Sequence, residues 1–228
     1  MRWLLIVLAL ALAGSTWAVA ITVCPSGCDY TTVQVAINAA VPGDVVEVQS
    51  GTYHENIAVN KSLSLEGKDT GSGMPLIDAG GSGSVVTFYN DNATLEGFNI
   101  TGSGHCGCGN AGVKVLSNND TVIGNIIHNN KYGIYESGYK GNKFLDNSLT
   151  DNNITVYALG LGEWQGNHYS DYQSPANGCE DANKDGICDR PYNVTPGPGN
   201  DSKPLASLMN KNIQLQAPLI QLLLNIPK

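Results

Sequence analysis

The segment from residue 181 to residue 189, DANKDGICD, has the residue types and spacing that most clearly indicate chemistry. Oxygen-bearing side chains stand at alternate positions, and Gly186 follows them where a sharp turn is needed. A hard cation such as calcium can collect six or seven oxygens, at about 2.4 Å each, from one short loop of this kind. We predict a calcium site with these ligands: Asp181, Asn183, Asp185, the backbone carbonyl of Ile187, and Asp189.

The end of this loop differs from an EF-hand, because Tyr192 stands at the twelfth position, where an EF-hand has glutamate. The loop resembles instead the calcium repeats of extracellular adhesive and dockerin-like modules. The alternative is a polar loop that holds no metal. Because the segment lies outside the repeated part of the chain, a calcium ion here is expected to be structural rather than catalytic.

Six cysteines allow about fifteen pairings, and the sequence does not choose among them. Nearness along the chain favours Cys24 with Cys28, and Cys179 with Cys188 across the predicted calcium loop. A bond between the latter two would hold the loop closed and reduce the entropy lost when a cation binds.

Cys106 and Cys108 flank a single residue in the insertion GSGHCGCGN. Three alternatives stay open for them. They could form a local disulfide, which would be strained because the ring is small, or disulfides between subunits. They could also form a soft-metal site for copper or zinc together with His105. The four scattered histidines and the absence of a methionine cluster give copper little support.

The carboxylates of the chain form no recognisable catalytic constellation, and we predict no catalytic residues. A calcium-dependent lyase needs a positioned Arg or Lys as its base, whereas the only arginine after the first 20 residues is Arg190. A hydrolase of sugars needs paired acid and base carboxylates, whereas Asp120, Asp146 and Asp151 fall at expected turns. A lyase or hydrolase acting on acidic glycans stays as an alternative, because catalytic residues can lie far apart in sequence.

Aromatic residues gather beside asparagine and aspartate toward the C-terminal end of the repeat. Aromatic faces next to hydrogen-bonding amides suit the binding of sugar rings. The alternative is that some of these rings fill the core or cover its end. The candidate glycan-binding residues are Tyr132, Tyr135, Trp164 and Tyr169.

A repeat of about 21 residues, which spans residues 111 to 172, must position these side chains. Each unit alternates short apolar patches with polar ones and closes on Asn or Asp. A unit this short cannot bury its own apolar face, so the units must stack and share one core, as in a solenoid. The stacked asparagines are Asn125, Asn147 and Asn167 in one column, and Asn130 and Asn152 in another.

The residues before the repeat indicate a leader, a helical lid and strands. Residues 1–20 have one positive charge, an apolar run too short to span a membrane and small residues near their end, as in a secretory signal peptide. Val33, Ile37 and Ala40 lie at helical spacing, so we expect a short helix that covers the first coil. The following segments alternate apolar with polar residues, as strands do.

The succession of a helix, GD-x-V-x-V, GTY-x-ENI-x-V, KSL-x-L-x-G and ID-x-G, up to residue 80, resembles the start of parallel β-helix proteins of the pectate-lyase-like superfamily. Secreted NosD-like proteins are the most similar, and the resemblance covers roughly residues 29–205. It implies an all-β fold: a right-handed parallel β-helix of about six coils, with a short N-terminal capping helix and an irregular C-terminal clasp. It implies no single activity, because this fold hosts lyases, hydrolases, epimerases, adhesins and envelope proteins.

The chain is expected to divide into five parts. Residues 206–228 end in an apolar patch too short to cross a bilayer, which could cap the last coil or dock on a neighbouring subunit. The expected parts are a signal peptide (1–20), an N-terminal cap with a helix (21–43), a parallel β-helix (44–172), a calcium-loop clasp (173–205) and a capping or docking tail (206–228).

Composition restricts the setting in which the protein works. The formal net charge is −8, and no cluster of Lys or Arg could neutralise phosphates, which argues against nucleic acid as a partner. The leader, the cysteines and the sequons indicate an oxidising, extracellular or cell-surface location. The candidate N-glycosylation sites are Asn60, Asn92, Asn99, Asn119, Asn153, Asn193 and Asn200.

The sequence therefore predicts a secreted, non-enzymatic protein of the cell envelope or extracellular space, with glycan binding or self-assembly as candidate activities. Its expected partners are an envelope polysaccharide or like subunits, and its expected structural cofactor is calcium. No transmembrane span is expected after the signal peptide. A copper-handling accessory role is a further alternative, because the NosD name is associated with copper maturation of a reductase.

Overall fold

The computed structural model describes residues 20–106 and 108–207. Residues 1–19 of the predicted signal peptide and residues 208–228 of the predicted tail lie outside the described residues.

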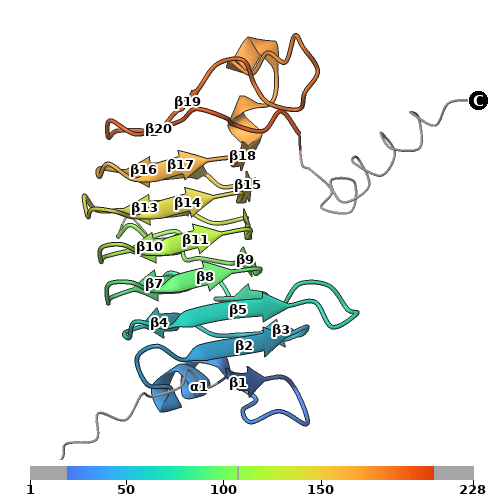
Figure 1. Cartoon of the computed structure of the whole chain (residues 1–228), viewed down its shortest axis with the longest axis vertical. Coiled ribbons are helices and arrows are strands. Elements are labelled where there is room, and N and C mark those ends of the chain that lie inside the picture. The colour runs from blue at the N-terminus through green and yellow to red at the C-terminus, as the bar shows by residue number, and fades with distance from the viewer. Residues whose placement is uncertain (1–19, 107, 208–228) are drawn as a thin grey trace, which may run out of the picture.

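The chain coils into a right-handed parallel β-helix, as the sequence predicts (Figure 1). Each complete coil contributes one strand to each of three sheets, which we name A, B and C in the order in which the chain enters them. Strands β2 to β16 make five complete coils, and β17 and β18 begin a sixth. The number of coils therefore agrees with the prediction of about six.

Neighbouring strands within each sheet come from successive coils. In spatial order, sheet A contains β1 (Ala20–Val23), β2 (Val45–Gln49), β5 (Ser64–Lys68), β8 (Thr94–Glu96), β11 (Thr121–Ile123), β14 (Lys143–Leu145), β17 (Glu163–Gln165), β20 (Asn200–Asp201) and β19 (Tyr192–Asn193). Sheet B contains β18 (His168–Tyr169), β15 (Ser148–Thr150), β12 (Ile126–His128), β9 (Asn99–Thr101), β6 (Leu76–Asp78) and β3 (Thr52–Tyr53). Sheet C contains β16 (Ile154–Ala158), β13 (Tyr132–Glu136), β10 (Ala111–Val115), β7 (Val86–Phe88) and β4 (Ile57–Val59).

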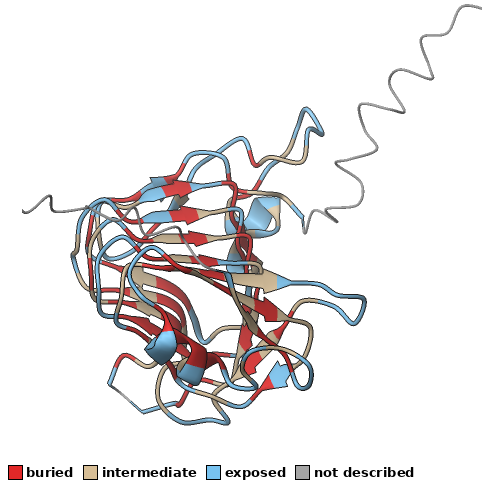
Figure 2. Ribbon diagram, turned by 60° about the horizontal axis from the view of Figure 1, so that its bottom comes forward, coloured by how far each residue is buried: buried red, intermediate tan, exposed pale blue. Residues whose placement is uncertain are grey.

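Parallel pairing keeps the inward side chains of successive coils in columns, and these columns form the core. Every residue of the columns in sheets A and B is at most 4% exposed, and Figure 2 shows buried positions lining the inside of the coils. Removing apolar surface from water in this way contributes roughly 25 cal/mol per Å². The sheet A column is Val46, Leu65, Leu95, Val122, Phe144 and Trp164. The sheet B column is Tyr53, Ile77, Ile100, Ile127, Leu149 and Tyr169.

The predicted asparagine columns are confirmed and lie inside the turns between sheets. Between sheets A and B, Asn147 Oδ1 accepts a hydrogen bond from the backbone N–H of Asn125 at 3.0 Å, and Asn167 Oδ1 accepts one from Asn147 at 2.9 Å. Between sheets B and C, Asn152 Oδ1 accepts one from the backbone N–H of Asn130 at 3.0 Å. Each amide thus satisfies a buried backbone group of the preceding coil, which fixes the register of the stack.

A third column, between sheets C and A, contains an aspartate. Asp120 accepts hydrogen bonds from the backbone N–H of Ala93 at 2.9 Å and from Ser117 Oγ at 2.5 Å, and its own N–H donates to Asn142 Oδ1 at 2.9 Å. Asp120 is 1% exposed, and burial raises the pKa of its carboxyl group to about 6. The expected turn position is correct, but the side chain points into the solenoid instead of into water.

The N-terminal end is closed by β1 and by α1 (Val33–Ala39), the predicted capping helix. Strand β1 pairs with β2 and adds a rung to sheet A, and Val33, Ala36 and Ile37 of α1 are buried. Side chains of the first coil bind both ends of the helix. The carboxylate of Glu55 accepts the N–H groups of Val33 and Gln34 at 2.8 and 2.9 Å, and Lys61 Nζ donates to the last carbonyls. These contacts satisfy groups that a helix leaves unpaired at its ends.

At the other end, the chain leaves the coil after β18 and later returns to it. The departing segment contains two 3₁₀ turns, η1 (Ser170–Tyr172) and η2 (Pro175–Asn177), and then the predicted cation loop. On its return, Pro196 bridges Ala158 in sheet C, Asp201 pairs with Trp164 in sheet A, and Leu205 bridges His168 in sheet B. The clasp predicted for residues 173–205 is therefore irregular in its first part, while its last ten residues lie in the order C, A, B of a further coil.

No helix among residues 20–106 and 108–207 is long and apolar enough to cross a membrane.

Candidate functional site

Three tyrosines lie side by side on the outer face of sheet C, and we call Tyr132, Tyr135 and Tyr157 the tyrosine patch. All three are partly exposed, and Tyr135 pairs with Tyr157 across β13 and β16. The rings of Tyr135 and Tyr157 stack with their centroids 5.0 Å apart and their planes 6° from parallel. The ring of Tyr132 stands edge-on to both, at 5.4 and 5.9 Å. The patch thus offers a rigid aromatic surface with phenol hydroxyls.

A lysine and the cysteine-containing insertion border the tyrosine patch. Lys114 pairs with Tyr135 across β10 and β13, and its Nζ lies 5.2 Å from the Tyr135 ring centroid, within cation–π range. The same Nζ donates a hydrogen bond to the carbonyl of Cys108 at 3.3 Å. A Cβ added at Gly109 would lie 3.1 Å from the Tyr135 ring, so the insertion approaches the ring closely. The structure therefore joins two features that the sequence left separate.

The cysteines form three local disulfides. The expected bonds Cys24–Cys28 and Cys179–Cys188 are both present. Of the three alternatives for Cys106 and Cys108, the structure has the local disulfide. All six cysteines of the chain are thereby paired, and neither a soft-metal site nor a bond between subunits uses them.

Trp164 and Tyr169 are core residues, which corrects their prediction as glycan-binding candidates. Trp164 is 3% exposed and stacks on Phe144 with ring centroids 4.0 Å apart. Tyr169 is 1% exposed, stacks on Tyr192 at 3.7 Å and donates its hydroxyl hydrogen bond to Asp201. Both occupy inward positions of their strands, so the alternation of the strand excludes them from the surface.

The predicted cation loop is anchored to the solenoid at both of its sides. The Cys179–Cys188 disulfide closes its base, and both cysteines are buried. Ile187 bridges Leu205 in an antiparallel arrangement, and the N–H of Cys188 donates to the carbonyl of Pro204 at 2.8 Å. The loop is therefore held against the last coil although its sequence breaks the repeat.

The loop oxygens are turned toward the loop's own backbone. Asp181 accepts hydrogen bonds from the N–H groups of Asp185 and Gly186, both at 3.0 Å, and Asn183 Oδ1 accepts one from Asp185 at 3.1 Å. Asp189 Oδ2 accepts the N–H of Ala182 at 3.0 Å, which brings the two sides of the loop together. Among the described residues, no three His, Cys, Asp or Glu side chains converge closely enough to hold a metal. The remaining expected ligands, an amide oxygen and a carbonyl, are of the oxygen type that calcium prefers.

The other carboxylates considered for catalysis lie apart. Asp146 and Asp151 are exposed turn residues with positive φ angles of 51° and 54°, as expected for turns. Glu136, by contrast, is buried at an inward position of β13 and accepts the N–H groups of Gly138, Tyr139 and Gly160. Its role visible in the structure is to hold the turns of two coils together.

The candidate glycosylation sites lie on the surface with one exception. Asn60, Asn92, Asn119, Asn153, Asn193 and Asn200 are exposed, whereas Asn99 is partly buried in β9. The Asn99 Oδ1 atom lies 2.7 Å from His128 Nε2.

Sequence reasoning missed two members of the site, Tyr157 and Lys114. The signal for Tyr157 was its place one repeat after Tyr135, which predicts that the two rings are neighbours in a parallel sheet. Lys114 occupies the same column one repeat earlier. Charge alone gave no reason to choose it, and its column position did.

No family model matches the sequence, and no curated protein is significantly similar to it. Solved structures with a similar arrangement include a pectin methylesterase in complex with a hexasaccharide, at 12% identity and a TM-score of 0.44, covering 65% of this chain and 54% of that one. The pectin methylesterase from Aspergillus niger in penultimately deglycosylated form gives 13% identity and a TM-score of 0.42, covering 70% of this chain and 62% of that one. The chain thus spans little more than half the length of these structures, and its fold assignment rests on its own strand pairing.

Proposed function

We propose that this chain is a secreted, non-enzymatic β-helix protein that binds an extracellular or cell-envelope polysaccharide through the tyrosine patch. The observation that carries the proposal is the patch itself. Three tyrosine rings lie partly exposed on rigid neighbouring strands and need no rearrangement to present their faces and hydroxyls. Pre-ordered aromatic groups lose little conformational entropy on binding, which favours affinity.

The chemistry of the patch suits sugar rings. An apolar sugar face can stack on an aromatic ring while its hydroxyls bond to neighbouring polar groups. The Lys114 ammonium beside Tyr135 can also bond a sugar hydroxyl or a carboxylate on an acidic glycan. The Cys106–Cys108 insertion borders the patch and would limit the ways in which a polymer can lie across it.

A non-enzymatic role is supported by where the carboxylates lie. Asp120 is enclosed in a buried column, Glu136 is held by three backbone N–H groups, and Asp146 points from an exposed turn. None of them is beside the tyrosine patch in a pair that could act as acid and base on a sugar held there. The chemistry that the patch itself can perform is binding.

Calcium is proposed as a structural cofactor of the 181–189 loop. The loop has three carboxylates, an amide oxygen and a carbonyl at alternate positions, and a disulfide closes its base. These donors fit calcium, which takes oxygen ligands in flexible geometry. Asp181, Asn183, Asp185, Ile187 and Asp189 would hold the ion, which would join the loop to the last coil.

Secretion is supported by the leader-like residues 1–20 and by three disulfides, which form and persist in oxidising compartments. An extracellular setting also agrees with the six exposed sequons. The resemblance to NosD-like proteins belongs with this proposal, as a pointer to the cell envelope.

Retention on a panel of insoluble polysaccharides, including uronate-containing ones, tests the proposal. The native protein should be retained by at least one polymer and should release no sugar from it. The variant Tyr135→Ala/Tyr157→Ala should lose retention roughly tenfold or more, because each stacked ring contributes about 0.5–1.5 kcal/mol. Tyr89→Ala is the matched control, since Tyr89 is 59% exposed and lies outside the patch. Equal retention of both variants would contradict the proposal, and release of sugar would overturn its non-enzymatic part.

A further inference from the structure

Sheet C stops short of the other two sheets at the C-terminal end. Sheet A continues from β17 to β20, and sheet B continues from β18 to Leu205. Among the described residues, β16 is the last strand of sheet C, and beyond it only Pro196 makes a bridge, to Ala158 at the end of the strand. Most of the outer edge of β16 therefore has a strand position beside it that no described residue fills. We call this the open strand position.

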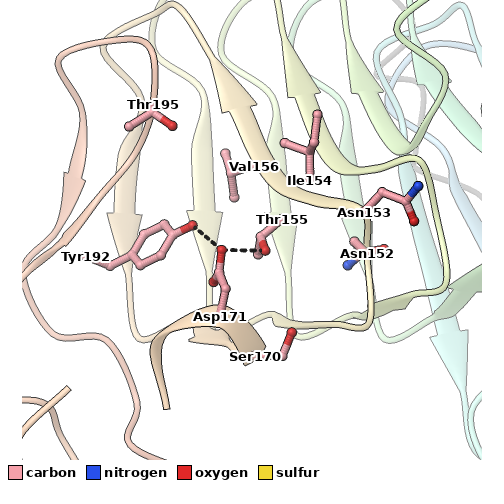
Figure 3. A pocket seen from close by; sticks show the side chains of 9 residues that line it. All are labelled: Asn152, Asn153, Ile154, Thr155, Val156, Ser170, Asp171, Tyr192 and Thr195. Atoms are coloured by element: carbon pink, nitrogen blue, oxygen red, sulfur yellow. Dashed lines mark hydrogen bonds between the residues drawn. The ribbon is translucent and has the colours of Figure 1, made fainter. Parts of the chain in front are cut away.

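A pocket of about 430 Å³ occupies the open strand position (Figure 3). Thr155 lines it from β16, Ser170 and Asp171 line it where the chain leaves the coil, and Tyr192 and Thr195 line it where the chain returns. Asp171 Oδ2 accepts hydrogen bonds from Thr155 Oγ1 at 2.8 Å and from Tyr192 at 3.3 Å, which join the walls of the pocket. The walls are thus defined, and one of them is a strand edge that can pair with an extended chain.

The step between sheets is constant in the regular coils. The inward residue of sheet C follows the inward residue of sheet B by seven positions: Ile134 follows Ile127 in the fourth coil, and Val156 follows Leu149 in the fifth. The same step can be applied to the last rung of sheet B, where the described chain ends.

In that last rung, Leu205 bridges His168 in parallel, which sets Ala206 beside Tyr169. Seven positions after Ala206 stands Ile213. Around it, residues 212–216 have the sequence NIQLQ, in which polar and apolar residues alternate as they do in a strand with one buried face. The described chain ends at Ser207, at the turn from sheet B to sheet C, so this segment is the next to reach the pocket.

We propose that residues 211–214 of the same chain fill the open strand position as a parallel strand of sheet C beside β16. Ile213 would lie beside Val156 with its side chain inward, and Gln214 would lie beside Tyr157 with its side chain outward. The strand would end there, because Pro196 already takes the position next to Ala158. Gln214 would then extend the outer column of Lys114, Tyr135 and Tyr157 by one amide.

A disulfide cross-link in the full chain tests this arrangement. The variant Tyr157→Cys/Gln214→Cys places two thiols on the same face of neighbouring strands, within the range that a disulfide spans. All six native cysteines are already paired, so no other thiols compete. The matched control is Tyr157→Cys/Ile213→Cys, whose two side chains would lie on opposite faces of the sheet.

After mild oxidation, non-reducing electrophoresis and peptide mass analysis should show an intramolecular link between positions 157 and 214. The control should keep both new thiols free. A link that forms only between two molecules would show that a second copy is the occupant and would overturn the intrachain proposal. No link, or equal linking in the control, would overturn it as well.

Hydrogen exchange supplies a second readout that needs no cysteine. In the full chain, Ile213→Asp should raise amide exchange in β16 roughly tenfold or more, because the added strand would no longer pack its inward residue. Leu222→Asp, farther along the same tail, is the matched control and should leave β16 exchange unchanged. Unchanged exchange in both variants, or an equal increase in both, would contradict the proposal.

Discussion

The two ends of the solenoid expose the same kind of backbone edge and inward side chains, yet they are closed differently. At the N-terminal end, β1 and α1 come directly before the first coil, and Glu55 and Lys61 of that coil bind the ends of the helix. At the C-terminal end, the chain leaves the coil after β18 and returns through Pro196, Asp201 and Leu205. One end is covered by a contiguous lid, the other by an excursion that returns.

The difference teaches where the end of a repeat has to be sealed by polar contacts. At the C-terminal end, Asp201 is 0% exposed and ends the asparagine column. Its carboxylate accepts both N–H groups of Asn167, from the backbone at 2.9 Å and from Nδ2 at 3.0 Å, and the hydroxyl of Tyr169 at 3.1 Å. The ring of Tyr192 covers the Tyr169 ring above the core. The excursion thus closes the column and the core, although it leaves sheet C one strand short.

The largest effect is expected at this C-terminal seal. Asp201→Ala leaves several buried donors without an acceptor and should lower the free energy of unfolding by roughly 3–5 kcal/mol. Asp201→Asn keeps one acceptor oxygen, as Asn167 does one coil earlier, and should cost markedly less. Urea unfolding followed by circular dichroism measures both. A loss below about 1 kcal/mol for Asp201→Ala would show that the column does not need its last member.

Calcium should act on the same end and leave the other unaffected. If the ion binds the 181–189 loop, calcium at about 100 times its dissociation constant raises the free energy of unfolding by about 2.7 kcal/mol. Melting curves in calcium and in EDTA measure the effect. The difference should vanish in Asp185→Ala and persist in Asp151→Ala, an exposed turn aspartate outside the loop. Coincident curves for the native protein would exclude the cation site.

A buried rung far from both ends provides a reference for the comparison. Burial raises the folded-state pKa of Asp120 from 3.8 to about 6, so its ionised form is disfavoured in the folded protein. The free energy of unfolding should therefore fall as pH rises from about 4 to about 6, by on the order of 2 kcal/mol, and should then be level. Asp120→Asn should remove this fall and gain stability at pH 7. An identical pH profile in the variant would contradict this assignment.

The smallest effect is expected at the N-terminal lid. Glu55→Gln removes the charge that accepts two N–H groups at the start of α1, and should cost about 1 kcal/mol. The exposed Glu96 supplies the control Glu96→Gln, which should change stability by less than about 0.5 kcal/mol. Denaturant midpoints of the two variants give the comparison. A loss as large as that of Asp201→Ala would mean that the two ends do not differ in the way described.

The sequence predicted well what repeats and poorly what interrupts the repeat. The columns of Asn125 and Asn130 were visible because parallel pairing places equivalent residues in register, and α1 was visible through the spacing of Val33 and Ile37. Strand β1 was missed because it begins at Ala20, the last residue assigned to the signal peptide. The return of Pro196 to the coil was missed because the excursion destroys the spacing on which register depends.

The candidate site was predicted in part for the same reason. Tyr132 and Tyr135 were recognised as surface candidates, but sequence alone could not separate them from Trp164 and Tyr169, which occupy inward positions. Side-chain direction depends on the exact strand register, and a shift by one residue reverses it. The contact between Tyr135 and the 102–110 insertion was beyond reach, because no periodicity relates the insertion to the strands.

The central claim is that the tyrosine patch binds polysaccharide, and the most direct test is calorimetric titration with an oligosaccharide cut from a retained polymer. The account predicts a dissociation constant roughly tenfold or more higher for Tyr135→Ala/Tyr157→Ala than for the native protein, and an unchanged one for Tyr89→Ala. Equal affinity of the native protein and the double variant would contradict it.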